Sequence, residues 1–462
     1  MTLRSNSQKE GLEDPPFSKP SYLKCRLDKY SMHAAMKTKN LLNLALLTSL
    51  ILSISCSSNS DKSTANSNVS TTRADVEDEQ ILAAKRLIEK MPDSADGYNR
   101  LAAAYIRRAR LTGDFSLYQK AELAVNKALE LEPDDFAATK LQAVLHIIFH
   151  RFHEAKQLAQ NLLTQAEDTI IYGVLTDANI ELGEYEQAIE SAQKMMNLKP
   201  SLEAYSRTAI LRSLHGQVES AIEAMRTAAS IADPLDTEVK AWCYVKLGDE
   251  YFKVGNFSEA EKNYDIALKI LPDYYLALSA KGKVLAAKGD FTQAIDLYNK
   301  AQNKVPIVET VIALGDLYYL QGDQEKAKLQ YDLAEVIEEK LGRTDMRRLA
   351  LLWADHSVRL DEALKIIESE YQKRKDIYTA DIYAWVLYKR GEFVKAKELI
   401  NEAMRLKTKD ARILYHAGMI ENSLGNKQQA RKYLEVALNL NPAFDLIQAK
   451  IAKDTLEELK KS

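Results

Sequence analysis

The sequence predicts an all-α protein, an array of about ten helix pairs, on the strength of two observations. Leu, Ala, Glu and Lys are abundant, while 16 Gly and 10 Pro are few for 462 residues, and this balance favours helices. From about Asp93 onward, small, aromatic and turn residues recur with a period of roughly 34 residues, which is typical of stacked helix pairs. The chain is therefore expected to be one extended array.

The clearest unit of this array runs from Tyr244 to Pro272. Its marks are small, aromatic and turn residues: Leu247, Gly248, Tyr251, Gly255, Ala260, Tyr264, Ala267 and Pro272. We expect Gly255 to end the first helix and Pro272 to follow the second, because proline cannot continue a helix. Small residues such as Gly248 let the two helices approach, and Tyr251 and Tyr264 fill the space between neighbouring hairpins.

A small residue that opens the second helix of each pair can be followed through the whole array. It is found at Ala121, Ala155, Ala188, Ala221, Ala260, Ala294, Ala327, Ala363, Ala396 and Ala430. Successive positions are 33 to 39 residues apart. Ten units with this rhythm predict ten helix pairs.

This pattern resembles the tetratricopeptide repeat, with its W-x2-L-G-x2-Y…A-x3-F…P spacing. The resemblance implies a right-handed α-solenoid over residues 79–442, and the polar segment 443–462 is expected to be a C-terminal capping helix. Three places depart from the pattern. Extra residues fall between the helices of the first unit and near Pro234, where we expect longer connections, and the unit around LALLWADHSVRLDEALKIIE lacks the glycines.

The N-terminal region carries a different pattern. Lys37 and Lys39 precede an apolar run from Leu41 to Ile54, which at about 14 residues is short for a bilayer span but fits a secretory signal peptide. Since such signal peptides begin at the initiator methionine, we interpret residues 1–35 as the product of an over-extended gene start. The true first residue would then be Met36 or Met32. The open alternative is an uncleaved anchor helix.

The end of the apolar run resembles a bacterial lipobox, in which a small residue precedes a lipidated cysteine. Ser55 and Ile54 fit this pattern before Cys56, whereas Ser53 stands where Leu is usual. The resemblance implies a signal peptide over residues 36–55 and lipid on Cys56. Residues 56–78, rich in Ser and Asn, are expected to form a flexible tether. Ser57 lacks the Asp of an inner-membrane retention signal, which favours the outer membrane.

Histidines cluster at one place, in HIIFHRFHE. The spacing puts His146, His150 and His153 on one face of a helix end, where a metal could bind. However, there is no HExxH motif and no distant set of ligands. In the repeat register His146 replaces the tyrosine between hairpins and His150 replaces the turn glycine, so packing is the preferred interpretation and no metal or cofactor is expected.

The first helices of a solenoid usually form its concave face, and this groove is where we expect a partner. The candidate groove residues mix charged and aromatic side chains: Trp242, Lys246, Asp249, Lys253, Lys283, Asp316, Tyr319, Asp381, Trp385 and Tyr388. Such a mixture suits a protein or peptide. Asp249 and Asp316 disfavour capture of an acidic C-terminus.

The sequence therefore predicts a membrane-anchored, non-catalytic scaffold that binds another envelope protein or peptide. The net charge of −3 gives no reason to expect nucleic acid as a partner, and no GxSxG, Walker or GxGxxG motif or Cys–His pairing occurs. Two alternatives remain open: a regulatory or sensory module that controls a signalling or assembly machine, and a metal-dependent enzyme using the histidine cluster.

Overall fold

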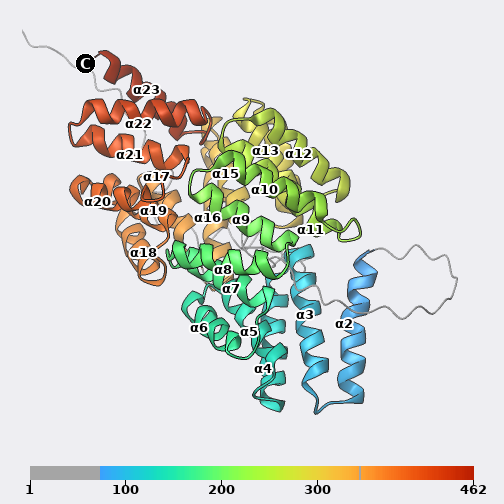
Figure 1. Ribbon diagram of the computed structural model, residues 1–462. Coiled ribbons are helices and arrows are strands. Elements are labelled where there is room, and N and C mark those ends of the chain that lie inside the picture. Colours follow the sequence, from blue (N-terminus) through green and yellow to red (C-terminus); the bar gives the residue numbers. More distant parts are fainter. Residues whose placement is uncertain (1–72, 343–344, 462) are drawn as a thin grey trace, which may run out of the picture.

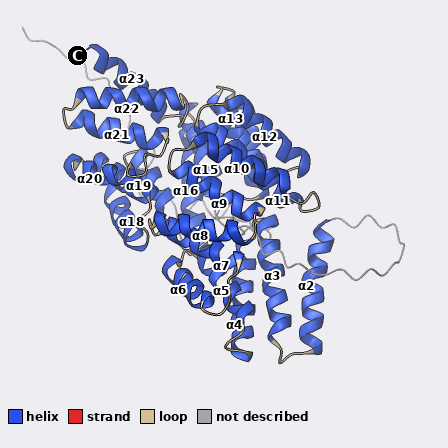
Figure 2. Cartoon of the chain, in the orientation of Figure 1, coloured by secondary structure: helices blue, strands red, loops and turns tan. Residues whose placement is uncertain are grey.

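The computed structural model describes residues 73–342 and 345–461, and this part of the chain contains 22 helices and no strand (Figure 2). The apolar run, Cys56 and the tether up to residue 72 lie outside the described residues. No helix within the described residues is both long and apolar enough to cross a membrane.

Ten antiparallel helix pairs follow one another from α3 to α22, and each stacks on the next (Figure 1). The first five pairs are α3–α4 (Ala95–Thr112, Phe115–Leu131), α5–α6 (Phe136–Ile148, Phe152–Leu163), α7–α8 (Thr169–Glu181, Tyr185–Leu198), α9–α10 (Leu202–Leu214, Val218–Ile231) and α11–α12 (Thr237–Lys253, Phe257–Ile270).

The second five are α13–α14 (Tyr275–Ala287, Phe291–Lys304), α15–α16 (Val308–Leu320, Gln324–Lys340), α17–α18 (Arg347–Asp355, Leu360–Lys373), α19–α20 (Ile377–Lys389, Phe393–Ala403) and α21–α22 (Ala411–Ser423, Lys427–Leu440). A single helix stands at each end, α2 (Arg73–Lys90) before the first pair and α23 (Gln448–Lys461) after the last. The predicted all-α solenoid of ten pairs is confirmed.

The pairs are held by the residues that define the period. All ten alanines that open the second helices are fully buried. Gly248 leaves room for the ring of Tyr264 from the second helix, and Gly315 does the same for Tyr331. These aromatic rings therefore pack inside their own hairpin, where an added Cβ on the glycine would overlap them.

Each hairpin turn contains at least one residue in the left-handed region, which glycine adopts without strain. Eight of the ten turns use a glycine; the turn of the second pair uses His150 (φ 58°), and that of the eighth pair uses Ser357 (φ 54°) and Arg359 (φ 47°). His150 thus takes the place of the turn glycine, as its register predicts. Ser357 marks the turn of the eighth pair, α17–α18, although that unit lacks the glycines of the pattern.

The prediction of longer connections at the first and fifth units is wrong about where the extra residues lie. The extra residues near the first and fifth units extend the first helices, so that α3 has 18 residues and α11 has 17, against 13 in α5. The helical period simply continues for another turn, because extending a helix adds backbone hydrogen bonds, whereas a longer loop adds none.

Candidate functional site: a cavity inside the superhelix

The inner side of the solenoid forms a cavity of about 760 Å³ that is partly open to solvent. Its walls come from the first helices of the third to the tenth pair and from the segment between α22 and α23, which includes Phe444 and Asp445. The walls combine apolar side chains with many charged ones, and carboxylates outnumber cationic groups among the lining residues. This is the concave surface that the sequence predicts as the place for a partner.

Seven of the ten predicted groove residues line this cavity, namely Trp242, Lys246, Asp249, Lys253, Lys283, Asp316 and Asp381. The remaining three, Tyr319, Trp385 and Tyr388, are not among the lining residues. The first helices do turn one face towards the cavity, as expected. These three residues lie on other faces of α15 and α19, since a helix of 13 residues also has faces that pack against its neighbours.

Two of the predicted groove carboxylates, Asp249 and Asp316, accept hydrogen bonds from tyrosines of their own hairpins. Tyr264 donates a hydrogen bond from its hydroxyl to Asp249 at 3.0 Å, and Tyr331 donates one to Asp316 at 2.8 Å. Lys246 forms an ion pair with Asp249 at 3.1 Å. These aspartates therefore fix the buried tyrosines, and their remaining acceptor positions are what they can offer to a ligand.

Lys283 is the cavity residue most available to a ligand. It is exposed, it forms no ion pair with the described residues, and its ammonium lies 4.3 Å from the ring centre of Phe252. The surrounding cavity walls displace part of the water around the ammonium of Lys283 and so lower its pKa, whereas nearby Asp249 acts in the opposite direction. An ammonium that has lost part of its hydration gains more from an incoming carboxylate or carbonyl than a fully solvated one does.

Trp385 lies in the protein interior. Its ring is stacked between Tyr388, at 4.7 Å, and His416, at 4.1 Å, and it is fully buried. The indole Nε1 donates a hydrogen bond to Asp355 at 2.8 Å. Trp385 is therefore a core residue that no partner can reach, and its predicted place in the groove is wrong. In the sequence, a tryptophan of the core cannot be distinguished from a tryptophan of the groove by its aromatic character alone.

The last three pairs make one end of the cavity acidic. Burial raises the pKa of Asp355 to about 6, and repulsion from Asp445 adds to this effect. Arg412 lies 3.5 Å from Asp445, and Asp381 is bonded to His416 Nδ1 at 2.8 Å. Negative charge therefore exceeds positive charge at this end of the cavity.

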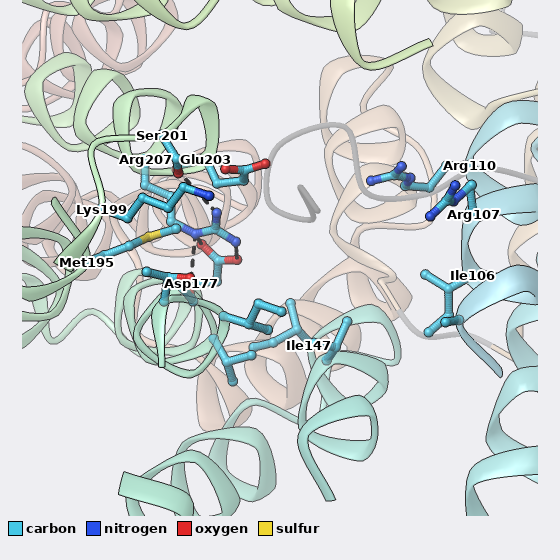
Figure 3. A pocket seen from close by; sticks show the side chains of 16 residues that line it. Ile106, Arg107, Arg110, Ile147, Asp177, Met195, Lys199, Ser201, Glu203 and Arg207 are labelled. Carbon is cyan, nitrogen blue, oxygen red and sulfur yellow. Dashed lines mark hydrogen bonds and ion pairs between the residues drawn. The ribbon is translucent and has the colours of Figure 1, made fainter. Parts of the chain in front are cut away.

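A smaller cavity of about 110 Å³ lies among the first four pairs (Figure 3). Arg207 forms a two-point ion pair with Asp177, with nitrogen–oxygen distances of 2.8 and 2.6 Å. Figure 3 shows Arg107 and Arg110 of α3 across the open space from this pair. Cationic groups are in excess here, so the two cavities differ in the sign of their charge.

The predicted histidines do not come together around a common point. His150 Nδ1 lies 3.1 Å from Arg374, and burial together with this arginine lowers the pKa of His150 to about 3. His153 is exposed, and burial lowers the pKa of His146. No cluster of potential metal ligands occurs among the described residues.

The structure also contains a contact surface that the sequence does not indicate. Hairpin turns of the first five pairs touch the linkers that follow the sixth, eighth, ninth and tenth pairs, and we call this line of contacts the seam. Its neighbours include Gly113 and Val305, Gly183 and Lys375, Gly216 and Lys407, and Gly255 and Leu440. The seam brings together segments about 190 residues apart in the sequence and closes the wall of the larger cavity.

Hydrogen bonds and ion pairs cross the seam at several points. The amide of Ile377 donates to the hydroxyl of Tyr185 at 2.9 Å, and Asn441 donates to the carbonyl of Phe252 at 2.8 Å. Arg374, which is 1% exposed, reaches Glu181 at 3.1 Å. The sequence gives one hint, since the linker KRKD at 373–376 is charged and, like those after the second, seventh and ninth pairs, lacks the proline that follows the other six pairs.

Comparison with known proteins places these features in a family. Models of the tetratricopeptide repeat match residues 245–306 and 411–444. A TPR repeat-containing protein of Methanocaldococcus jannaschii is 21% identical over 405 residues, which are 75% of this chain and 70% of that protein. The human protein O-mannosyl-transferase TMTC1 is 26% identical over 224 residues, 46% of this chain but only 25% of the relative.

Among solved structures, yeast Tom70 aligns with 84% of this chain and 94% of its own, with a TM-score of 0.38 and 15% identity. The family models match the fifth, sixth and tenth helix pairs, and buried alanines and left-handed turn residues recur every 33 to 39 residues through all ten pairs. The chain is a tetratricopeptide-repeat protein.

Proposed function

We propose that this protein is a non-catalytic scaffold, anchored to the bacterial outer membrane by lipid on Cys56, that binds another envelope protein or peptide in its central cavity. The observation that carries the binding proposal is the cavity of about 760 Å³, whose walls offer both apolar surface and charged groups. Cavities of this composition bury apolar side chains of a ligand while a few polar groups fix its orientation.

The family supports the general part of this proposal. Tetratricopeptide-repeat proteins in general act as protein-interaction scaffolds, and such scaffolds are generally non-catalytic. One relative is named as a mannosyl-transferase, but the present chain corresponds to only 25% of its length. A scaffold function requires only the groove, and stacked repeats supply it.

The membrane part rests on the sequence before residue 73. A short apolar run, two preceding lysines, Cys56 in a lipobox-like setting and a polar tether form a consistent series. A lipid on Cys56 with a tether of about 20 residues would hold the solenoid near the bilayer while leaving its cavity free to meet a partner.

Binding in the cavity can be tested by photo-crosslinking in cells. A photoreactive amino acid at Lys283, inside the cavity, is expected to capture a defined envelope protein. The matched control places it at Lys262 on the outer helix α12, whose side chain is 65% exposed and lies outside the cavity. Equal capture from both positions, or none from Lys283, would contradict binding in the cavity.

Tethering is tested by mass spectrometry of the mature N-terminus. We expect an acylated Cys56 as the first residue and recovery of the protein with outer-membrane vesicles. Cys56→Ser should move the protein into the soluble envelope fraction without changing its far-ultraviolet circular dichroism. An intact Met36 at the N-terminus would refute the lipid anchor and leave the uncleaved helix as the alternative.

A further inference from the structure

We propose that the seam is a reversible latch, which opens while the helix pairs stay folded and so widens the cavity for a partner. The purpose of the latch rests on the proposed function, whereas the opening itself can be measured without any partner. Four features of the described residues support it: the composition of the seam, the distribution of its charges, the bare turns elsewhere in the array, and the position of the cavity wall.

The seam is made of turns, linkers and helix ends. Face-to-face helix packing occurs within a pair and between successive pairs, as in α11 with α12 or α11 with α13. Because each pair of a solenoid is stabilised mainly by its nearest neighbours, separating the seam leaves this packing intact. Opening therefore costs the seam contacts alone.

At the centre of the seam, most charged groups have an oppositely charged partner on their own side. Opening the seam would therefore leave few charges without a partner. Arg374 contacts Glu370, four residues before it, at 2.8 Å and Asp345 at 3.5 Å, and both lie on its own side. From the other side it is faced by Glu181, by His150 and by the ring of Phe152, whose centre lies 5.2 Å from the guanidinium carbon. After opening, Arg374 keeps two carboxylates.

Glu181 is the group left behind, and it can adapt. Burial raises the pKa of Glu181, against the lowering effect of Arg347 and Arg374, so it is held in an environment that disfavours its charge. Water entering the opened seam would solvate this carboxylate. A buried pair whose members each regain solvation or another partner is easier to separate than one that leaves an isolated charge.

The free turns of the array show that a released turn is stable by itself. Gly289, Gly322, Gly391 and Gly425 have the same left-handed backbone as the seam glycines, yet no described atom would lie within 4 Å of an added Cβ. The turn conformation therefore does not depend on the seam, and the turns of the first five pairs can keep it after release.

The cavity wall spans the seam. Glu181, Tyr185 and Leu214 line the cavity from one side, and Asp376 and Asn441 line it from the other. An apolar cluster that includes Tyr185, Leu214 and Ile377 supplies the closing force. Movement at the seam therefore changes the width of the cavity directly.

Hydrogen exchange at one amide reports the latch. The Ile377 amide is the first of α19 and has its hydrogen bond across the seam, to Tyr185. We expect it to be protected, yet to exchange at least about tenfold faster than the amide of Val386 in the middle of the same helix, since local opening precedes global unfolding. Residue-resolved mass spectrometry of the full chain measures both.

A conservative variant sharpens this measurement. Tyr185→Phe removes the acceptor and should speed exchange at Ile377 by about 3- to 10-fold, while Val386 stays within twofold of the parent. Exchange at Ile377 as slow as at Val386 would overturn the latch, because the seam would then open only with unfolding. Unprotected exchange at Ile377 in the parent would overturn it equally, since no closed seam would exist.

A second measurement does not depend on Tyr185. Arg405→Ala with Thr408→Ala removes two side chains that donate to carbonyls across the seam, those of Gly183 and Leu214. The radius of gyration from small-angle scattering should rise with unchanged helicity. The control, Arg390→Ala with Lys427→Ala at bare turns, should leave it unchanged. Identical radii in both variants would refute the latch, whereas the crosslinking from Lys283 tests the scaffold function separately.

Discussion

Alanine substitution at Gly216 tests the seam most directly, because the chain contains a matched control. Gly216 and Gly391 both occupy hairpin turns with positive φ, +69° and +81°. An added Cβ at Gly216 would lie 2.6 Å from the carbonyl oxygen of Lys407 across the seam, whereas at Gly391 it would meet no described atom within 4 Å. The two substitutions differ in the seam contact and share the backbone strain.

The magnitudes follow from this difference. Placing alanine in the left-handed region costs about 1–2 kcal/mol at either position. At Gly216 the linker must also retreat by several tenths of an ångström, which adds about 1–3 kcal/mol of overpacking or lost contact. We therefore expect a loss of about 2–5 kcal/mol for Gly216→Ala and about 1–2 kcal/mol for Gly391→Ala.

Urea unfolding followed by circular dichroism and by tryptophan fluorescence measures both losses. Gly216→Ala should also speed exchange of the Ile377 amide, and Gly391→Ala should leave that amide unchanged. Equal destabilisation by the two variants would refute the reasoning, since it would mean that contact across the seam contributes nothing to stability in solution.

Three further outcomes follow from the buried charges. Arg374→Met should destabilise the fold by about 3–5 kcal/mol because it leaves buried carboxylates without their cationic partner. Arg390→Met, which removes a solvent-exposed ion pair, should cost less than about 1 kcal/mol. Thermal unfolding of the two variants measures both losses. Glu338 is fully buried, its carboxylate has no hydrogen-bond partner among the described residues, and burial raises its pKa to about 8. The free-energy cost of burying the ionised carboxylate is therefore absent below about pH 4.5 and complete above pH 8. In urea titrations, Glu338→Gln should thus stabilise the fold by about 1–3 kcal/mol at pH 8.5 and change its stability little at pH 4. The pKa of His150 is lowered to about 3, so the unfolded chain takes up a proton below pH 6.5 that the folded chain refuses. Stability should fall from pH 6.5 towards pH 3, and His150→Asn, which tolerates the left-handed turn, should flatten that fall; an unchanged pH profile would count against a neutral His150.

Much of the local structure could be predicted from the sequence, because each device acts within one hairpin. The spacing of buried alanines sets where two helices touch, and Gly248 opposite Tyr264 sets how closely. The left-handed turn at His150 could be placed by register alone. Seven groove residues could be placed as well, since the first helices of stacked pairs turn one face inward.

The amino-acid sequence by itself determined ten hairpins and their order, since the interactions that form a hairpin lie within one period. Only the tertiary structure decided that Trp385 is buried between Tyr388 and His416, and that the turn of Gly216 meets the linker at Lys407. Small rotations between successive pairs add up over five units, and the angle of each depends on side-chain packing at its interface. A local period does not encode that sum, so the seam and the cavity that it closes emerge only when the whole array is assembled.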